Sequence, residues 1–109
     1  MKKLALVLSV ALLPLTVHAA EVDAEAAQAL LKKSDCFKCH AIDKKKDGTP
    51  YREVAKKYKG KPDAEDKLYT HVTTGPKVKL EDGSEEEHKI IKSKSEPEIR
   101  NVIKWILSL

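Results

Sequence analysis

The chain has 109 residues, with 21 Lys or Arg against 17 Asp or Glu, and its formal net charge at pH 7 is +4. Two of the basic residues, Lys2 and Lys3, stand at its very start, and without them the balance is 19 − 17 = +2. So small a surplus gives no indication of a nucleic-acid partner. Aromatic residues make up only 5% of the chain, which is thin for a self-sufficient core.

The first residues, MKKLALVLSVALLPLTVHAA, combine two lysines, an apolar run from Leu4 to Val17 and small residues at the end. This order is typical of a secretory signal peptide. The apolar run is too short for a bilayer span, which needs roughly 20 residues. We therefore predict a signal peptide over residues 1–19, cleavage after Ala19, a single domain over 20–109, and a periplasmic protein. An uncleaved membrane anchor is the alternative.

Residues 23–33, DAEAAQALLKK, predict a first helix, because strong helix formers are flanked by acids in the first turn and lysines in the last. Its apolar stripe of alanines and leucines ends where the two cysteines begin. We expect this helix to deliver the cysteine segment to its site.

The next segment, DCFKCHAI at 35–42, has two cysteines three positions apart and a histidine directly after the second. In a helical turn Cys36 and Cys39 lie on one face and reach two points on one edge of a flat ligand, while His40 projects beneath it. This is the pattern of covalent c-type haem attachment. It predicts one haem c, bound through thioethers to both thiols, with His40 as the proximal iron ligand. A buried haem would also supply the missing apolar bulk.

Three other uses of these cysteines are less consistent with the sequence. A disulfide would close a very short ring with little entropic gain. A thioredoxin-like motif would follow a strand, and no strand-like alternation precedes Asp35. A zinc site would need two further histidines, but His71 and His88 are too far apart in the sequence for a compact finger.

Residues 43–50 contain Gly, Pro and a run of charge, and predict a loop. From Tyr51, the sequence YREVAKKYKG has apolar residues at helical spacing and ends at a glycine, which predicts a second helix. A third helix is expected to start near Asp63 and to end at Gly75.

Residues 75–94 show no sustained period and predict a long loop with a small turn or hairpin at LEDGS. Loops of this length in compact domains are usually functional. The final helix has a capping box, Ser95 followed by Glu98, and then an apolar stripe that runs to Ile106. The prediction is an all-α protein of about four helices.

The order of these elements resembles the small class I c-type cytochromes of bacterial periplasms. The resemblance rests on CFKCH at 36–40, on GTPYREVAKKYKG at 48–60 and on VIKWILSL at 102–109, and it covers nearly all of residues 20–109. It implies helices wrapped around one haem, with the first and last helices crossing. It also implies that Trp105 packs near the haem, although a tryptophan that anchors the helix crossing explains the residue equally well.

The chain departs from this family at two places. The family often has Gly-Pro after the attachment site, and the proline carbonyl accepts a hydrogen bond from the proximal imidazole. Here the order is Gly48-Thr49-Pro50, so either Thr49 or Pro50 is the expected acceptor. The second departure is that the loop in which the family carries its axial methionine has none, because the only methionine is Met1.

Two histidines other than His40 remain in the predicted domain as candidates for the second axial ligand. His88 precedes Trp105 by about as many residues as the family methionine precedes its terminal tryptophan, and we predict that it binds the iron opposite His40. His71 lies away from the apolar stripe of its helix and is expected to be a solvated surface residue. An open or water-bound iron and a lysine ligand from the same loop are the alternatives.

These inferences predict a protein that carries single electrons between transient redox partner proteins. We expect bis-histidine ligation, a potential lower than that of a histidine–methionine centre, no enzyme activity and a monomer without stable membrane insertion. The alternative function is a haem protein with an open distal site that binds or senses a small gaseous ligand.

Overall fold

A computed structural model describes residues 9–15 and 21–109. The predicted cleavage site after Ala19 lies outside the described residues, so the division into 1–19 and 20–109 remains a prediction. In the described part of the chain, none of the helices is both long and apolar enough to cross a bilayer. Four α-helices, one 3₁₀ turn and one small hairpin form the domain, in the order α1 (Ala24–Lys33), 3₁₀ turn (Cys36–Lys38), α2 (Tyr51–Tyr58), α3 (Ala64–Thr74), β1 (Lys77–Lys79), β2 (Glu85–Glu87) and α4 (Glu96–Leu107).

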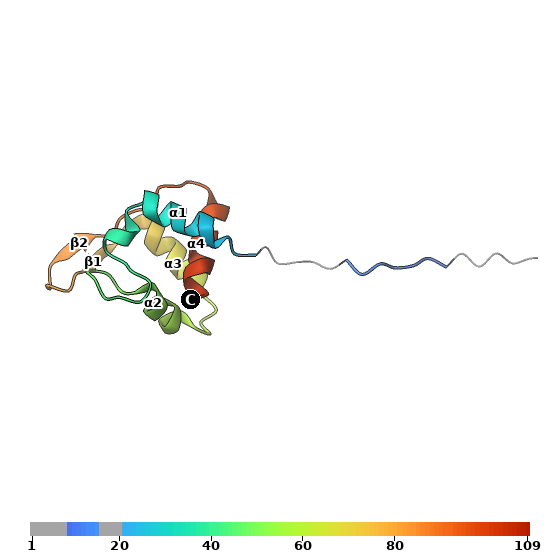
Figure 1. The fold of residues 1–109 in the computed structure, drawn as a ribbon, viewed down its shortest axis with the longest axis horizontal. Helices are drawn as coiled ribbons and strands as arrows, with labels where there is room; N and C mark the ends of the chain where they lie inside the picture. The colour runs from blue at the N-terminus through green and yellow to red at the C-terminus, as the bar shows by residue number, and fades with distance from the viewer. Residues whose placement is uncertain (1–8, 16–20) are drawn as a thin grey trace, which may run out of the picture.

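Helix α4 is the centre of the fold, since it packs against α1, α2 and α3 (Figure 1). Its buried stripe is the one that the sequence predicts, and Val102 and Ile103 are fully buried. The start of α1 is joined to α4 by a reciprocal pair of hydrogen bonds. The Asp23 N–H donates to Asn101 Oδ1, and Asn101 Nδ2 donates to the Asp23 carbonyl, both at 2.9 Å. The predicted association of the first and last helices is confirmed.

The helix ends follow the capping residues in the sequence. Asp23 caps α1 by accepting the Ala26 N–H at 2.9 Å. Gly75 ends α3 with φ of +62°, a left-handed conformation that glycine adopts at little cost. The cap of α4 differs in detail from the predicted box. Ser95 Oγ accepts the Glu98 N–H at 3.5 Å, as in a capping box. The Glu98 side chain, however, does not bind the Ser95 N–H directly. The Ser93 hydroxyl lies between them, donating to the Glu98 carboxylate and accepting the Ser95 N–H.

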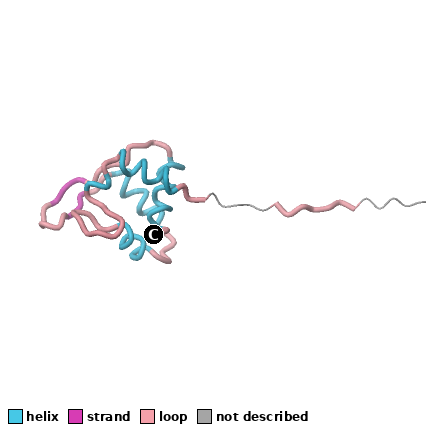
Figure 2. Tube along the Cα trace, viewed as in Figure 1, coloured by secondary structure: helices cyan, strands magenta, loops and turns pink. Residues whose placement is uncertain are grey.

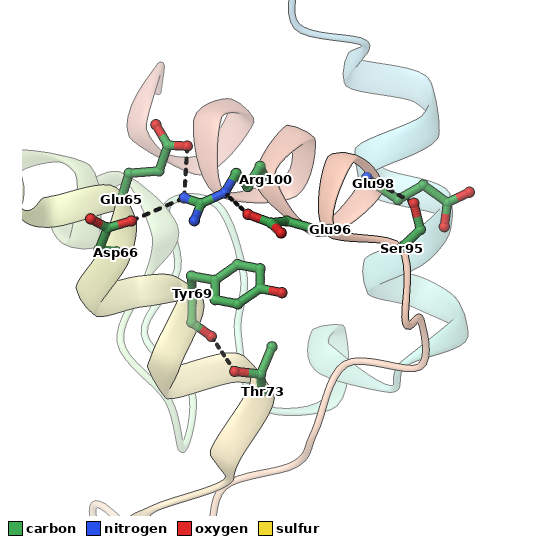
Figure 3. Close-up of polar contacts among 8 residues, drawn as sticks. All are labelled: Glu65, Asp66, Tyr69, Thr73, Ser95, Glu96, Glu98 and Arg100. Atoms are coloured by element: carbon green, nitrogen blue, oxygen red, sulfur yellow. Dashed lines mark hydrogen bonds and ion pairs between the residues drawn. The ribbon is translucent and has the colours of Figure 1, made fainter.

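A cluster of charged residues joins α3 to α4. The Arg100 guanidinium donates to Glu96 on its own helix at 2.8 Å and to Glu65 and Asp66 on α3, both at 3.1 Å (Figure 3). The guanidinium also lies 4.7 Å from the ring centre of Tyr69, one turn further along α3. Arg100 therefore holds α3 against the central helix by contacts along its first two turns.

The only strands in residues 21–109 form an antiparallel hairpin that projects from one end of the helical body (Figure 2). Lys77 pairs with Glu87, and Lys79 pairs with Glu85. Glycine at position 83, with φ of +85°, makes the turn. The hairpin confirms the turn expected at LEDGS, and it is small enough that the protein is all-α in class.

Candidate functional site

The cysteine segment leaves α1 through a sharp change of backbone direction. Asp35 has φ of +61°, and its left-handed conformation turns the chain into the 3₁₀ turn that begins at Cys36. The N–H groups of Cys39 and His40 both donate to the Cys36 carbonyl, at 3.2 and 2.9 Å. One tight turn thus holds the two thiols and the imidazole together, as the sequence predicts.

Both cysteines are free thiols and are half-buried, so the short disulfide does not form. Burial raises the pKa of the Cys36 thiol. Ser34, directly before the turn, is only 1% exposed. Its hydroxyl accepts the Lys92 N–H at 2.8 Å and so fixes the turn. This bond joins the attachment turn to the segment that follows the hairpin. This bond could not be predicted from the sequence, since a lone serine after a helix has no distinctive pattern.

His40 is held by its Nδ1 atom, which donates to the Thr49 carbonyl at 2.7 Å. Because a carbonyl can only accept, Nδ1 carries the proton and Nε2 is left for a metal. Of the two acceptors considered from the sequence, the structure selects Thr49 over Pro50. Gly48 makes this geometry possible, since a Cβ at position 48 would lie 2.7 and 2.8 Å from two atoms of the His40 ring.

An aromatic group packs behind the His40 ring. The Tyr51 ring, from the start of α2, is stacked on it with ring centres 4.8 Å apart and an interplanar angle of 18°. Phe37 and Trp105 contact Tyr51 edge-on, with centres at 6.1 and 6.3 Å. Trp105 is 6% exposed and contacts Tyr51, whose ring is stacked on that of His40. The sequence singled out Trp105 but not Tyr51, which it assigned to the apolar stripe of its helix.

His88 follows directly after β2, and the structure brings its ring to within 6.0 Å of the His40 ring, centre to centre. Its N–H donates to the Pro76 carbonyl at 2.8 Å, and its Nδ1 donates to the Lys89 carbonyl at 2.9 Å. As at His40, a carbonyl on Nδ1 leaves Nε2 without a proton and available to a metal. Burial lowers the pKa of His88, which favours the neutral ring that a metal requires.

His71 is not the solvated surface residue that its helical position suggested. Its ring is half-buried and packs against the ring of His88, with centres 4.3 Å apart. Burial lowers its pKa also. The prediction was wrong because it considered only the apolar stripe of α3, whereas the partner of His71 comes from the chain returning out of the hairpin.

The lysines of the loop that are the alternative ligands either contact other residues or are exposed to solvent. Lys77 and Lys79 are exposed on β1, and the Lys92 ammonium is 3.5 Å from the Asp35 carboxylate. Across residues 9–15 and 21–109, no three His, Cys, Asp or Glu side chains gather as ligands for a bare metal ion.

The residues present fit a covalently attached haem. Two free thiols and a histidine with an available Nε2 share one turn, and the ring centre of a second such histidine lies 6.0 Å from that of the first. Partly buried apolar side chains packed against the core, among them Leu68, Val72 and Ile42, come from α3, which carries His71, and from the segment just after His40. Such side chains provide the apolar walls that a haem needs.

Comparisons with known proteins agree with this chemistry. The sequence model of the family described as "Cytochrome c" matches residues 24–109. The chain is 40% identical to cytochrome c-551 of Pseudomonas aeruginosa over 52 residues, which is 48% of this chain and 50% of the relative. It is 42% identical to cytochrome c-552 of Hydrogenobacter thermophilus over 50 residues, 46% of this chain and 51% of the relative. These alignments thus span about half the length of each relative.

Solved structures match over more of the chain. The class 1 cytochrome MtoD from Sideroxydans lithotrophicus ES-1 is 55% identical, with a TM-score of 0.78 over 81% of this chain and 97% of that protein. Cytochrome c552 of Nitrosomonas europaea is 25% identical, with a TM-score of 0.59 over 75% of this chain and 98% of that protein. The family binds its haem through the Cys-x-x-Cys-His motif found here at residues 36–40. The chain therefore belongs to the cytochrome c family, as a small class I monohaem member with one covalent haem c.

Proposed function

We propose that this protein carries single electrons between redox partner proteins in the periplasm, and that His40 and His88 bind its iron from opposite sides. The signal-like sequence at residues 1–19 and the family membership support the location and the role. The relatives named above are all cytochromes, which supports electron transfer as the activity.

The position of the His88 ring is the observation that carries the ligand proposal. Two imidazoles that bind one metal ion from opposite sides, each at about 2 Å, have ring centres roughly 6 Å apart. The centres of His40 and His88 are 6.0 Å apart. The spacing of the two rings therefore fits an iron held between them.

The hydrogen bonds of the two rings support the same reading. Histidines that bind metals generally donate their other ring nitrogen to a carbonyl or carboxylate, which fixes the ring and makes it a stronger ligand. His40 does so to Thr49 and His88 to Lys89. Each ring is thus held by Nδ1, with Nε2 available for binding a metal.

When bound, haem c supplies a one-electron ferric–ferrous couple. The chain's contribution is to orient two imidazoles and to surround them with apolar side chains. If His40 and His88 both bind the iron, no open position would remain for a substrate, which supports the role of an electron carrier. Imidazole in place of a methionine thioether lowers the potential.

The ligand proposal is tested by replacing His88 in the haem-loaded protein. His88→Ala should convert a low-spin, six-coordinate ferric iron into a high-spin or water-bound one, as measured by absorption and electron paramagnetic resonance spectra. His88→Met should restore six-coordination and raise the reduction potential, because a thioether favours ferrous iron.

His71→Phe is the matched control, since it removes the neighbouring imidazole but keeps a ring of similar size beside His88. It should leave the iron low-spin. Loss of the low-spin spectrum in His71→Phe, with none in His88→Ala, would move the ligand to α3 and refute the assignment. Ready binding of carbon monoxide to the reduced, unaltered protein would instead favour the gas-binding function.

A further inference from the structure

The C-terminal end of α3 and the residues just after it bind the segment around His88 by two backbone hydrogen bonds. Pro76 has no N–H, so the Val72 carbonyl lacks the partner that a continuing helix would supply. The Ile91 N–H takes this place at 2.9 Å, and the Pro76 carbonyl accepts the His88 N–H at 2.8 Å. The chain is thereby fixed at His88 and again three residues later.

Gly75 allows the two segments to come this close. A Cβ at position 75 would lie 2.7 Å from the His88 carbonyl oxygen, which no side chain tolerates without a shift of the backbone. The residue also has φ of +62°. The corner at the end of α3 is thus shaped to receive the backbone of His88.

The His88 side chain is restrained by two contacts of its own, the hydrogen bond from Nδ1 to the Lys89 carbonyl at 2.9 Å and the packing of its ring against a second ring. The His71 ring lies one turn before Gly75 on α3 and meets the His88 ring at 4.3 Å between centres and 56° between planes. This tilted arrangement is favourable for two aromatic rings. Both rings are half-buried, so the contact is partly shielded from water.

We propose that His71 is a positioning residue, whose ring packs against His88 and keeps the His88 imidazole on the iron. The proposal rests on the proposed function, because it takes His88 as the distal ligand. His71 itself does not bind the iron. Without its ring, His88 would leave the iron more often, and an added ligand would compete for the open position more successfully.

Cyanide binding to the ferric haem protein tests this role. His71→Ala should remain low-spin at equilibrium, but its apparent affinity for cyanide should rise about threefold to tenfold, the factor expected when one aromatic contact is lost. His71→Phe should restore the affinity of the unaltered protein, since it keeps the ring contact without an imidazole. Thr70→Ala, at an exposed position of the same helix, controls for a general weakening of α3.

The outcomes separate this inference from the one on which it rests. If His71→Ala binds cyanide no better than Thr70→Ala, or if His71→Phe fails to restore the original affinity, the positioning role is refuted while His88 remains the ligand. If His88→Ala keeps the low-spin spectrum of the unaltered protein, the ligand assignment fails and the positioning role fails with it.

Discussion

Gly48 shows how a single hydrogen atom in place of a side chain can control an iron ligand. A Cβ there would lie within 2.9 Å of the Cys39 carbonyl oxygen and closer still to the His40 ring. In Gly48→Ala the ring must move, which should destabilise the protein by about 1–3 kcal/mol, as other overpacked sites do. The reduction potential should also rise, because a weaker bond to Thr49 makes His40 a weaker donor to ferric iron. Urea denaturation and redox titration measure the two effects.

Gly83→Ala is the control for this prediction. Gly83 has φ of +85° and open space around its Cβ position, so alanine should cost only the strain of a left-handed residue, about 1–2 kcal/mol. The potential should not change. Equal shifts in potential for the two variants would show that the effect at Gly48 is not a local contact with His40.

The site residues that sequence reasoning identified are those with a local pattern. Cys36, Cys39 and His40 share the segment 36–40, whereas His88, whose role as a ligand stays a prediction, was inferred from its distance to Trp105 and from the family resemblance. His71 and Ser34 were missed because their partners, His88 and Lys92, lie far away in the sequence. The sequence could not distinguish Thr49 from Pro50 as the acceptor for His40, because every residue has a backbone carbonyl.

At the scale of elements, the Arg100 cluster fixes the helix that carries His71. Arg100→Ala would remove three hydrogen bonds and leave the carboxylates of Glu65, Asp66 and Glu96 facing each other. Its side chain is 28% exposed, so solvent screens the contacts only in part. We expect a lower melting temperature with an unchanged haem spectrum. Arg100→Lys should recover part of the loss, since an ammonium lacks the planar fork.

Lys67→Ala is the comparison for Arg100→Ala on the same helix. Lys67 makes one exposed pair with Asp63 at 3.0 Å, and such pairs contribute little. Its melting temperature should hardly change. A drop as large as that of Arg100→Ala would mean that charge on α3, and not the contact with α4, is responsible.

The four helices were predicted to within about a residue at most ends because each has an apolar stripe bounded by capping residues, prolines or glycines. The hairpin was expected only as a turn, since strands of three residues that are mostly exposed show little periodicity. Its consequence, the return of His88 to α3, depends on backbone hydrogen bonds that no sequence pattern records.

The hydrophobic core of the protein contains few large side chains. The two buried large aromatic residues are Tyr51 and Trp105, and both lie toward His40. A domain of this size gains stability from an added group that completes its core. Replacing both thiols, as Cys36→Ala with Cys39→Ala, should therefore give an apoprotein that is largely unfolded by circular dichroism.

His88→Ala provides the contrast, because it keeps both thioether bonds and hence the haem within the core. It should stay helical under the same conditions. A well-folded double cysteine variant would show that the polypeptide alone makes a sufficient core.

The hairpin also makes the position of His88 independent of the number of residues at the hairpin tip. Since Pro76 and His88 are joined at their backbones, residues 77–87 leave the body and return to the point of departure. Residues can be added or removed at the tip, around Gly83, without displacing His88. The tip is therefore a suitable attachment site. A cysteine or a short peptide tag placed there would tether the protein to an electrode in a defined orientation, with the iron site left intact.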